Sequence, residues 1–195
     1  QLHFGKISEC ESKNIVVYGS CDIGGICGQI LCGGEIVNCK NSGRVKAGYL
    51  NAGGICGYTL PDYEIDCDGT ASVKDCVNTG VVESFKNSGG ICGEINNESV
   101  VDNCINNGAI QGLEQVGGIV GYAHSSYLNN CTNNGDIKAS QYTGGICGME
   151  YGGNDGYQVL YCVNTGNITS CFGYGGGICG EIKVCVYVNY CYNTG

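Results

Sequence analysis

The 195-residue sequence has no tryptophan, one proline and one methionine, and only 14% of its residues are charged. No apolar run approaches the roughly 20 residues of a membrane-spanning helix, so we expect no direct membrane insertion. Lys and Arg number 9 against 18 Asp and Glu, giving a formal net charge of -9. An acidic surface without a Lys/Arg stripe excludes nucleic acid as a partner. An initiating methionine and a signal peptide are also absent, so we expect a mature or excised segment.

Glycine (36 residues) and cysteine (17 residues) are abundant and follow a repeat. Without a Gly-X-Y period, this much glycine excludes collagen. The pentapeptide GGICG begins at Gly24, Gly53, Gly89, Gly144 and Gly176, and the variant GGIVG begins at Gly117, with Val120 in place of cysteine. Each copy is followed by a Cys-x-Asn-x-Gly box, whose cysteines are Cys39, Cys76, Cys104, Cys131, Cys162 and Cys191. The two boxes together repeat about every 28 residues, in the range of solenoids and propellers.

The segments between the boxes are short and rich in β-branched residues, which favours strands over helices. Three such segments occur in each repeat, so the sequence predicts an all-β fold, a β-solenoid with three short strands per rung and six to seven rungs. A propeller blade needs about 40 residues, more than this period supplies. We expect one domain, residues 1–195, with a partial rung at 1–23 and rungs that start near residues 24, 53, 89, 117, 144 and 176.

One position of the repeat predicts a special backbone conformation. In the partial first copy, Asn14 stands where the later Cys-x-Asn-x-Gly boxes have glycine. Glycine and asparagine are the residues that best tolerate a positive φ. We therefore expect a left-handed turn at this position in every rung.

The pair of boxes resembles the GLUG repeat, named for its Gly-Leu-any-Gly core, with isoleucine here in place of leucine. The resemblance extends from about Cys10 to Gly195. GLUG repeats occur in large secreted or surface-anchored bacterial proteins, including adhesin-like proteins and non-catalytic parts of immunoglobulin A metallopeptidases. The resemblance implies an extracellular or cell-surface location and a spacer or binding role. A His-Glu-x-x-His motif is missing from this sequence, so zinc-peptidase chemistry is not expected in it.

The cysteines allow three interpretations: disulfides, free thiols that pack as small hydrophobes, and metal ligands. Val120 favours the packing interpretation. In its rung the glycine-box cysteine is absent while Cys131 of the second box remains, so a disulfide between the two boxes is not obligatory. The candidate disulfides are Cys21 with Cys32 and Cys171 with Cys185, pairs that flank a glycine box at non-repeating positions. The cysteines expected to form core ladders are Cys27, Cys56, Cys92, Cys147 and Cys179 in the glycine box, and Cys39, Cys76, Cys104, Cys131, Cys162 and Cys191 in the second box.

The two longest insertions follow glycine boxes and contain the remaining candidate site residues. In the longer insertion, the acidic residues Glu64, Asp66 and Asp68 alternate as in a calcium loop and Asp75 falls at the twelfth position, although a solvated acidic turn has the same pattern. Calcium is the one cofactor we consider. The shorter insertion contains Tyr151 and Tyr157, which either form a glycan or protein contact surface or cover the edge of the solenoid. His124, beside two serines, is expected to be a surface histidine.

Catalytic constellations are nearly absent, so we expect no enzyme. The sequence instead predicts a structural or adhesive extracellular repeat segment that acts as a spacer and presents loops to a host or cell-surface protein or glycan. The first alternative is a filament subunit that self-associates through uncapped solenoid ends. The second alternative is a polysaccharide-active β-helix enzyme.

Overall fold

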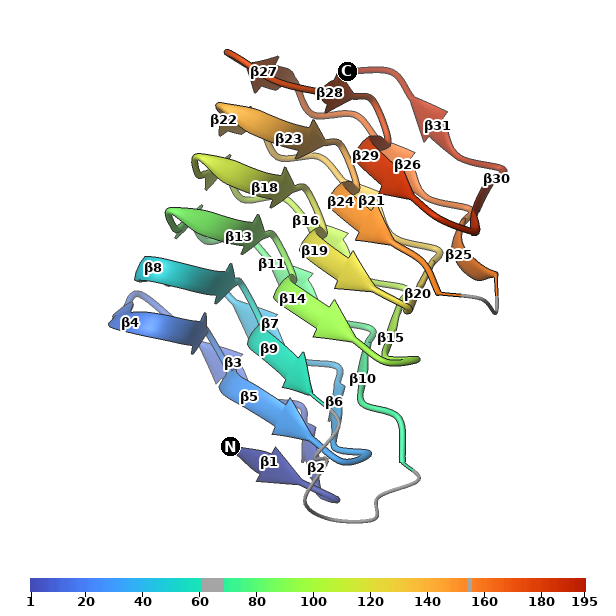
Figure 1. Ribbon diagram of the computed structural model, residues 1–195. Coiled ribbons are helices and arrows are strands. Elements are labelled where there is room, and N and C mark those ends of the chain that lie inside the picture. Colours follow the sequence, from blue (N-terminus) through green and yellow to red (C-terminus); the bar gives the residue numbers. More distant parts are fainter. Residues whose placement is uncertain (61–68, 154–155) are drawn as a thin grey trace.

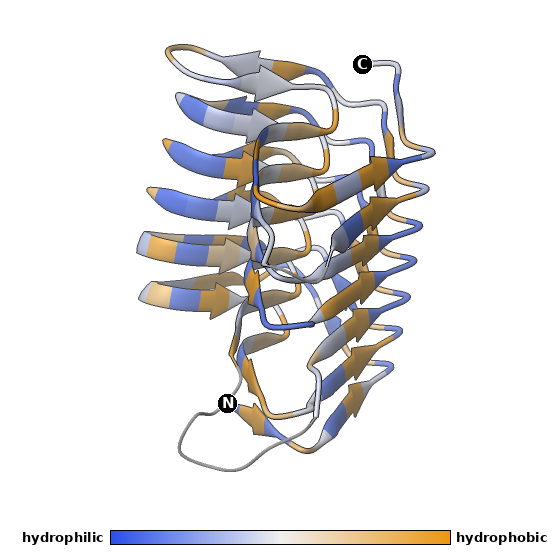
Figure 2. Ribbon diagram, turned by 45° about the vertical axis from the view of Figure 1, so that its right-hand side comes forward, coloured by the Kyte–Doolittle hydropathy of each residue, from blue (hydrophilic) through white to orange (hydrophobic). Residues whose placement is uncertain are grey.

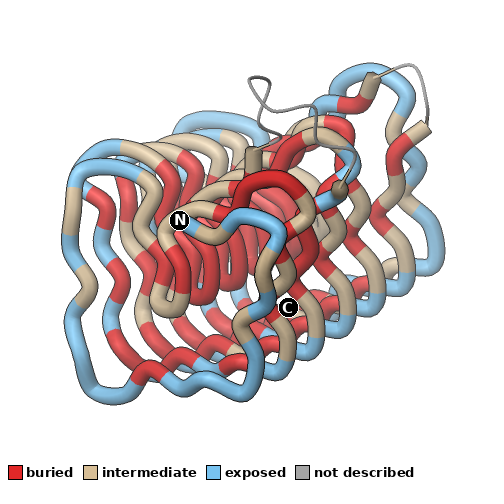
Figure 3. Tube along the Cα trace, turned by 90° about the horizontal axis from the view of Figure 1, so that it is seen from below, coloured by how far each residue is buried: buried red, intermediate tan, exposed pale blue. Residues whose placement is uncertain are grey.

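The structure is a computed structural model that describes residues 1–60, 69–153 and 156–195. Among these residues every regular element is a β-strand, and all strand pairs are parallel. The chain winds as a β-solenoid whose successive turns stack along one axis (Figure 1). A view along this axis shows the turns one behind another, with buried residues inside and exposed residues outside (Figure 3). The predicted fold class is therefore confirmed.

Four parallel sheets run along the coil, and three of them take one strand from each turn. Sheet A contains β1 (Leu2–His3), β5 (Cys27–Leu31), β9 (Cys56–Leu60), β14 (Cys92–Asn96), β19 (Val120–His124), β24 (Cys147–Tyr151) and β29 (Cys179–Lys183). Sheet B contains β2 (Lys6–Ser8), β6 (Glu35–Val37), β10 (Ser72–Lys74), β15 (Val100–Asp102), β20 (Tyr127–Asn129), β25 (Tyr157–Leu160) and β30 (Val186–Asn189). Sheet C contains β3 (Glu11–Ser12), β7 (Lys40–Asn41), β11 (Val77–Asn78), β16 (Ile105–Asn106), β21 (Thr132–Asn133), β26 (Val163–Asn164) and β31 (Tyr192–Asn193).

Sheet D takes either one long strand or two short strands from a turn. It contains β4 (Val16–Gly24), β8 (Arg44–Gly53), β12 (Val82–Glu83), β13 (Lys86–Gly89), β17 (Ile110–Gln111), β18 (Glu114–Gly117), β22 (Ile137–Ala139), β23 (Gln141–Gly144), β27 (Ile168–Ser170) and β28 (Gly175–Gly176). The three segments predicted for each rung correspond to sheets A, B and the first half of D. The two-residue strands of sheet C were not predicted, because the Cys-x-Asn-x-Gly box has the composition of a turn. The return half of D was not predicted either, because periodicity along the chain does not reveal the fold-back.

The glycine box forms the bend between sheets D and A. Its isoleucine side chains and the cysteines that start the sheet A strands point into the main core, which also receives the sheet B aliphatics. Hydrophobic residues accordingly recur at equivalent places in successive turns (Figure 2). The second glycine of the box has no room for a side chain: a Cβ on Gly90 would lie 2.1 Å from the Gly118 carbonyl oxygen and 2.4 Å from the Asn106 side chain.

That asparagine belongs to a ladder of buried amides in sheet C, one from each Cys-x-Asn-x-Gly box. Each Nδ2 donates to the Oδ1 of the asparagine in the next turn, at 2.7–2.8 Å, from Asn41 through Asn78, Asn106, Asn133 and Asn164 to Asn193. In the inner turns the second Nδ2 proton goes to a glycine carbonyl, and Oδ1 also accepts that glycine's N–H. Every polar group of these amides is therefore paired, which is what burial demands.

The expected left-handed turn lies at a different position of the repeat. Asn14 does have a φ of 51°, but among the described glycines only Gly33 and Gly156 have positive φ. The glycines aligned with Asn14 are required by stacking instead, because a Cβ on Gly80 would lie 1.8 Å from the Gly43 carbonyl oxygen. The left-handed residues precede the box cysteines, with φ of 51–56° at Glu9, Asn38, Asp75, Asn103, Asn130, Tyr161 and Tyr190.

Candidate functional site: the outer face of the arm

The strands of sheet D form an arm that projects from the coil. We define the arm as residues 16–24, 44–53, 82–89, 110–117, 137–144 and 168–176, one segment from each of six turns. In each segment the chain runs outward, bends and returns, and the two halves enclose a second hydrophobic cluster. This cluster contains Val45, Ala47, Ala52, Val82, Ile110, Val116, Ile137 and Ala139. Because the arm has a core of its own, its outer face is held by packing and not by loop conformation alone.

Polar side chains stand in a column on the outer face of the outgoing half. Strand register places Lys46 beside Glu83, Glu83 beside Gln111, and Gln111 beside Lys138. The Glu83 carboxylate contacts the Arg44 guanidinium and lies 3.9 Å from Lys46 Nζ. Neither the Gln111 amide nor the Lys138 ammonium has a side-chain partner among the described residues. These two groups are therefore available to a ligand.

Three adjacent hollows follow this column. The first (about 340 Å³) extends from Lys46 and Glu83 to Phe85 and Leu113, the second (about 190 Å³) lies between Leu113 and Lys138, and the third (about 340 Å³) lies beside Lys138. All three share Gln111. We call these adjacent hollows together the arm trough and define it by Lys46, Glu83, Phe85, Gln111, Leu113 and Lys138.

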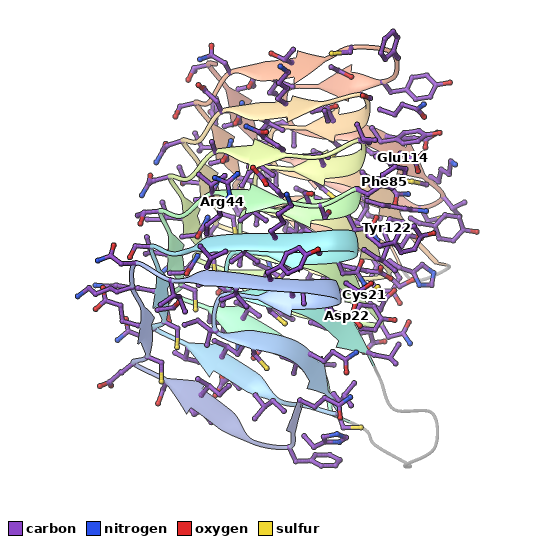
Figure 4. The ribbon with its side chains drawn as sticks, turned by 90° about the vertical axis from the view of Figure 1, so that its left-hand side faces the viewer. Cys21, Asp22, Arg44, Phe85, Glu114 and Tyr122 are labelled. Atoms are coloured by element: carbon purple, nitrogen blue, oxygen red, sulfur yellow. The ribbon has the colours of Figure 1, made fainter. Side chains whose placement is uncertain are left out.

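Exposed apolar side chains line the outer rim of the trough, where the arm bends. Phe85 is 45% exposed, and its ring stacks with Tyr49, at a centroid distance of 6.1 Å and an interplanar angle of 19°. Leu113 is also 45% exposed. Figure 4 views this side of the molecule, with Arg44 at one end of the outgoing strands and Phe85 near the bend. The rim thus offers flat apolar surface beside polar groups, the usual composition of a binding site.

A second cluster of polar side chains lies at the inner corner between sheets D and A, and its members form hydrogen bonds with one another. Asp22 accepts from Gln29 (2.7 Å) and Asn51 (2.7 Å), and Asn51 accepts from Asn87 (2.8 Å). Asn87 also donates to Glu94 at 2.8 Å. Burial raises the pKa of Glu94, and the amides that donate to its carboxylate oppose that rise. Since these carboxylates already have amide partners, we assign the corner a structural role.

The predicted cysteine ladders are present in the core. In sheet A, Cys27 pairs in register with Cys56, Cys56 with Cys92, and Cys147 with Cys179, while Val120 occupies the gap. All predicted ladder cysteines are free thiols, buried except for the half-buried Cys179 and Cys191. Burial raises the pKa of the Cys92 and Cys147 thiols well above the ordinary value. Such protonated thiols are poor nucleophiles and metal ligands, so these two sheet A cysteines act as packing groups.

Neither predicted disulfide is formed. Cys21, Cys171 and Cys185 are exposed free thiols, and Cys32 is disulfide-bonded, but not to any of these. The predicted partners lie on different parts of each turn. Cys21 is in β4 of the arm, whereas Cys32 follows β5 of sheet A; Cys171 follows β27 of the arm, whereas Cys185 lies between sheets A and B. The sequence positions of these cysteines suggest disulfides, but they do not reveal which part of the turn each cysteine occupies.

Of the four candidate calcium ligands, Glu64, Asp66 and Asp68 lie outside the described residues. Asp75 is at the left-handed corner before its box cysteine, and its Oδ1 accepts a hydrogen bond of 2.6 Å from Asn103. Within residues 1–60, 69–153 and 156–195, no cluster of three or more His, Cys, Asp or Glu side chains is arranged to hold a metal ion. No helix in that part of the chain is long and apolar enough to cross a membrane.

The two tyrosines of the shorter insertion do not form one exposed surface. Tyr157 is only 5% exposed, and its ring packs at 5.4 Å from that of Tyr127, so it covers sheet B. Tyr151 is 38% exposed and lies 5.3 Å from the His124 ring. Sequence reasoning missed the arm trough altogether. The signal was present in the alternation from Arg44 to Ala47, but it does not show that the chain folds back after four residues.

Comparison with known proteins supports the fold and little more. The chain matches no protein-family model, GLUG included, and no curated protein. Among solved structures it is similar to a protein of Bacteroides ovatus that is provisionally described as an immunoglobulin A1 protease, with 18% sequence identity and a TM-score of 0.59. The match covers 92% of this chain and 66% of that chain. At this identity the likeness shows a shared fold alone.

Proposed function

We propose that this chain is a non-catalytic repeat segment of a secreted or cell-surface protein, a scaffold that presents the arm for contact with another surface. The observation that carries the proposal is the exposed apolar rim of the arm. Tyr49, Phe85 and Leu113 occupy the bends of three successive turns, each about half exposed. An exposed apolar row beside polar groups is characteristic of an interaction surface. The provisional description of the Bacteroides ovatus protein as a protease of a secreted immunoglobulin agrees with an extracellular setting.

The coil is suited to this role because its turns are bound to each other by repeated contacts. The buried asparagine ladder joins each pair of neighbouring turns from Asn41 to Asn193. The four sheets also join neighbouring turns by backbone hydrogen bonds along the coil. A scaffold of this kind holds the arm segments in fixed register, so several weak contacts can act together.

The test is binding of the fluorescently labelled chain to immobilised mucin and to intact bacterial and epithelial cells. A double variant, Tyr49→Ser with Phe85→Ser, is compared with the unaltered chain. We expect binding to fall at least about tenfold, because two exposed rings supply much of such a contact. The control is Tyr187→Ser with Tyr192→Ser, which removes two exposed tyrosines from sheets B and C. Equal loss in both double variants, or no binding to any of the surfaces, contradicts the proposal.

A second candidate function, the filament subunit, is favoured by a specific match between the two ends of the asparagine ladder. Ser12 stands in register with Asn41, and its buried Oγ has no hydrogen-bond partner. At the other end, Asn193 Nδ2 has no acceptor among the described residues, while its Oδ1 accepts from Asn164. In a head-to-tail stack, Asn193 of one copy would donate to Ser12 of the next.

Size-exclusion chromatography with negative-stain imaging tests the filament. Head-to-tail stacking would produce particles longer than one copy along the coil axis. The variant Asn193→Asp, which lacks the Nδ2 donor, should form shorter particles. A monodisperse rod roughly 30 Å long, the height of seven stacked strands, is the result that rules the filament out.

A further inference from the structure

We propose that the arm trough binds an oligosaccharide laid across successive turns of the coil. This inference rests on the proposed function, since it names the ligand class for the same arm. The trough spans at least three turns, because its three adjacent hollows share Gln111 as a lining residue, and two of them also share Lys138. Its length therefore suits a chain of linked units better than a single small molecule.

The trough repeats its polar groups at the spacing of the turns. Lys46, Glu83, Gln111 and Lys138 occupy equivalent positions on neighbouring strands. Neighbouring strands lie about 4.8 Å apart, which is close to the length of one hexose unit in an extended glycan. A glycan along the trough would thus bring about one sugar to each turn, and each sugar would meet a polar side chain on the same side.

The chemistry of the trough fits hydroxyl groups on one side and sugar C–H faces on the other. The free Gln111 amide can both donate and accept, and the Lys138 ammonium donates. Phe85, stacked on Tyr49, and Leu113 form the apolar rim. The floor consists of small residues, Ala47, Gly48, Ser84 and Gly112 among them, so the ligand can lie close to the backbone.

Peptides and nucleic acids fit the trough less well. An extended peptide binds strongly by pairing its backbone with a free strand edge. Here β12, β17 and β22 already have a strand neighbour on each side, so the trough offers a sheet face and no edge. Nucleic acid is disfavoured by the net charge of -9. The trough nevertheless contains Lys138, which forms no ion pair among the described residues, whereas Arg44 and Lys46 contact Glu83, so a uronic acid unit beside Lys138 is compatible with it.

The experiment is a screen of the full chain against an array of neutral and uronic-acid-containing oligosaccharides, followed by calorimetric titration of the best ligand. We expect Phe85→Ala to weaken binding about tenfold and Gln111→Ala several-fold. The matched controls are Tyr192→Ala on sheet C and Gln158→Ala on sheet B, both outside the trough, which should change the dissociation constant less than about twofold. Circular dichroism of each variant checks that the fold is kept.

The outcomes separate this inference from the proposed function. If no oligosaccharide binds, or if the two trough variants bind as the unaltered chain does, the glycan inference is overturned. The arm proposal would survive that result as long as the Tyr49 and Phe85 double variant still loses cell-surface binding. If cell-surface binding is also insensitive to that double variant, both proposals fail.

Discussion

Glu150 is a carboxyl group at a position where other turns have apolar or small residues. In sheet A it stands in register with Ala123 on one side and Ile182 on the other, and it is 0% exposed. Its Oε1 has no hydrogen-bond partner, and Cys147 Sγ lies 3.7 Å from Oε2. Burial raises the pKa of this carboxyl to about 8, so the folded chain carries it protonated at neutral pH.

The first prediction is that stability falls as the pH rises through the range in which Glu150 is protonated only in the folded state. Between pH 4.5 and 8 the folded chain holds a proton that the unfolded chain has released, so each pH unit lowers the free energy of unfolding. Between pH 5 and 8.5 this carboxyl should lower the free energy of unfolding of the unaltered chain by roughly 4 kcal/mol, and Glu150→Gln should abolish that decrease. Urea unfolding at both pH values measures this difference. If the free energy of unfolding of the variant falls with pH as much as that of the unaltered chain, the prediction for Glu150 is contradicted.

The second prediction concerns the asparagine ladder. Asn106→Asp keeps the shape but removes the Nδ2 donor, so the Asn133 Oδ1 loses a partner in a buried position. The new carboxylate oxygen would face two acceptors, the Gly108 carbonyl oxygen and the Asn133 Oδ1, and burying negative charge against acceptors also costs free energy. We expect a loss of roughly 3 kcal/mol or more in the free energy of unfolding at pH 7. The adjacent exposed Asn107, changed to Ala, is the control and should cost less than about 1 kcal/mol.

At the scale of the element, the sheets separate the cysteines into two reactivity classes. Cys10, Cys21, Cys171 and Cys185 are exposed. The sheet A ladder cysteines Cys56, Cys92 and Cys147 lie in the core, where desolvation raises the pKa of their thiols. Reactivity follows access and the thiolate fraction, so the two classes should differ by orders of magnitude in rate.

The third prediction is that a brief pulse of iodoacetamide labels the four exposed thiols and leaves Cys56, Cys92 and Cys147 unmodified until the chain is unfolded. Peptide mass spectrometry identifies the labelled sites. Rapid native labelling of the sheet A ladder would show that this core opens readily. A Val120→Cys variant extends the test: its new thiol should be as protected as its neighbours, with a stability change below about 1.5 kcal/mol.

The sheets also show how far the sequence could be used for prediction. The period, the strand class and the core cysteines follow from residues that recur at one spacing. The arm could not be predicted, because Val82 and Val116 belong to different halves of a fold-back that periodicity along the chain does not reveal. The asparagine ladder was overlooked because a polar residue beside glycine is typical of a turn; only in-register stacking makes Asn78 and Asn106 partners.

At the scale of the whole molecule, each turn contacts its nearest neighbours, so stability is distributed along the coil. In the middle, β14 and β19 are buried and paired on both sides, whereas both residues of β31 are exposed. In a stack of this kind, opening begins at the terminal turns and moves inward.

The fourth prediction is a gradient of amide hydrogen exchange along the chain. Amides of Cys92–Asn96 and Val120–His124 should exchange slowest, and those of Val186–Asn189 and Tyr192–Asn193 fastest. Exchange followed by mass spectrometry of peptic peptides measures the gradient. Uniform protection from end to end would mean that the coil unfolds as one unit. Loss of the gradient only at high protein concentration would instead support head-to-tail stacking.

The interlocking of the two boxes also constrains how such a gene can change. Because the second glycine of a box fits against the asparagine of its own turn and against a glycine carbonyl of the next turn, a duplicated or deleted stretch is compatible with the coil only when it comprises a whole turn. Unequal recombination between repeats produces such changes. Shorter insertions are tolerated at the corner between sheets A and B, where both long connections, between β9 and β10 and between β24 and β25, already lie. Copy number and corner length can therefore vary independently, while the column of trough residues gains or loses one member for each turn.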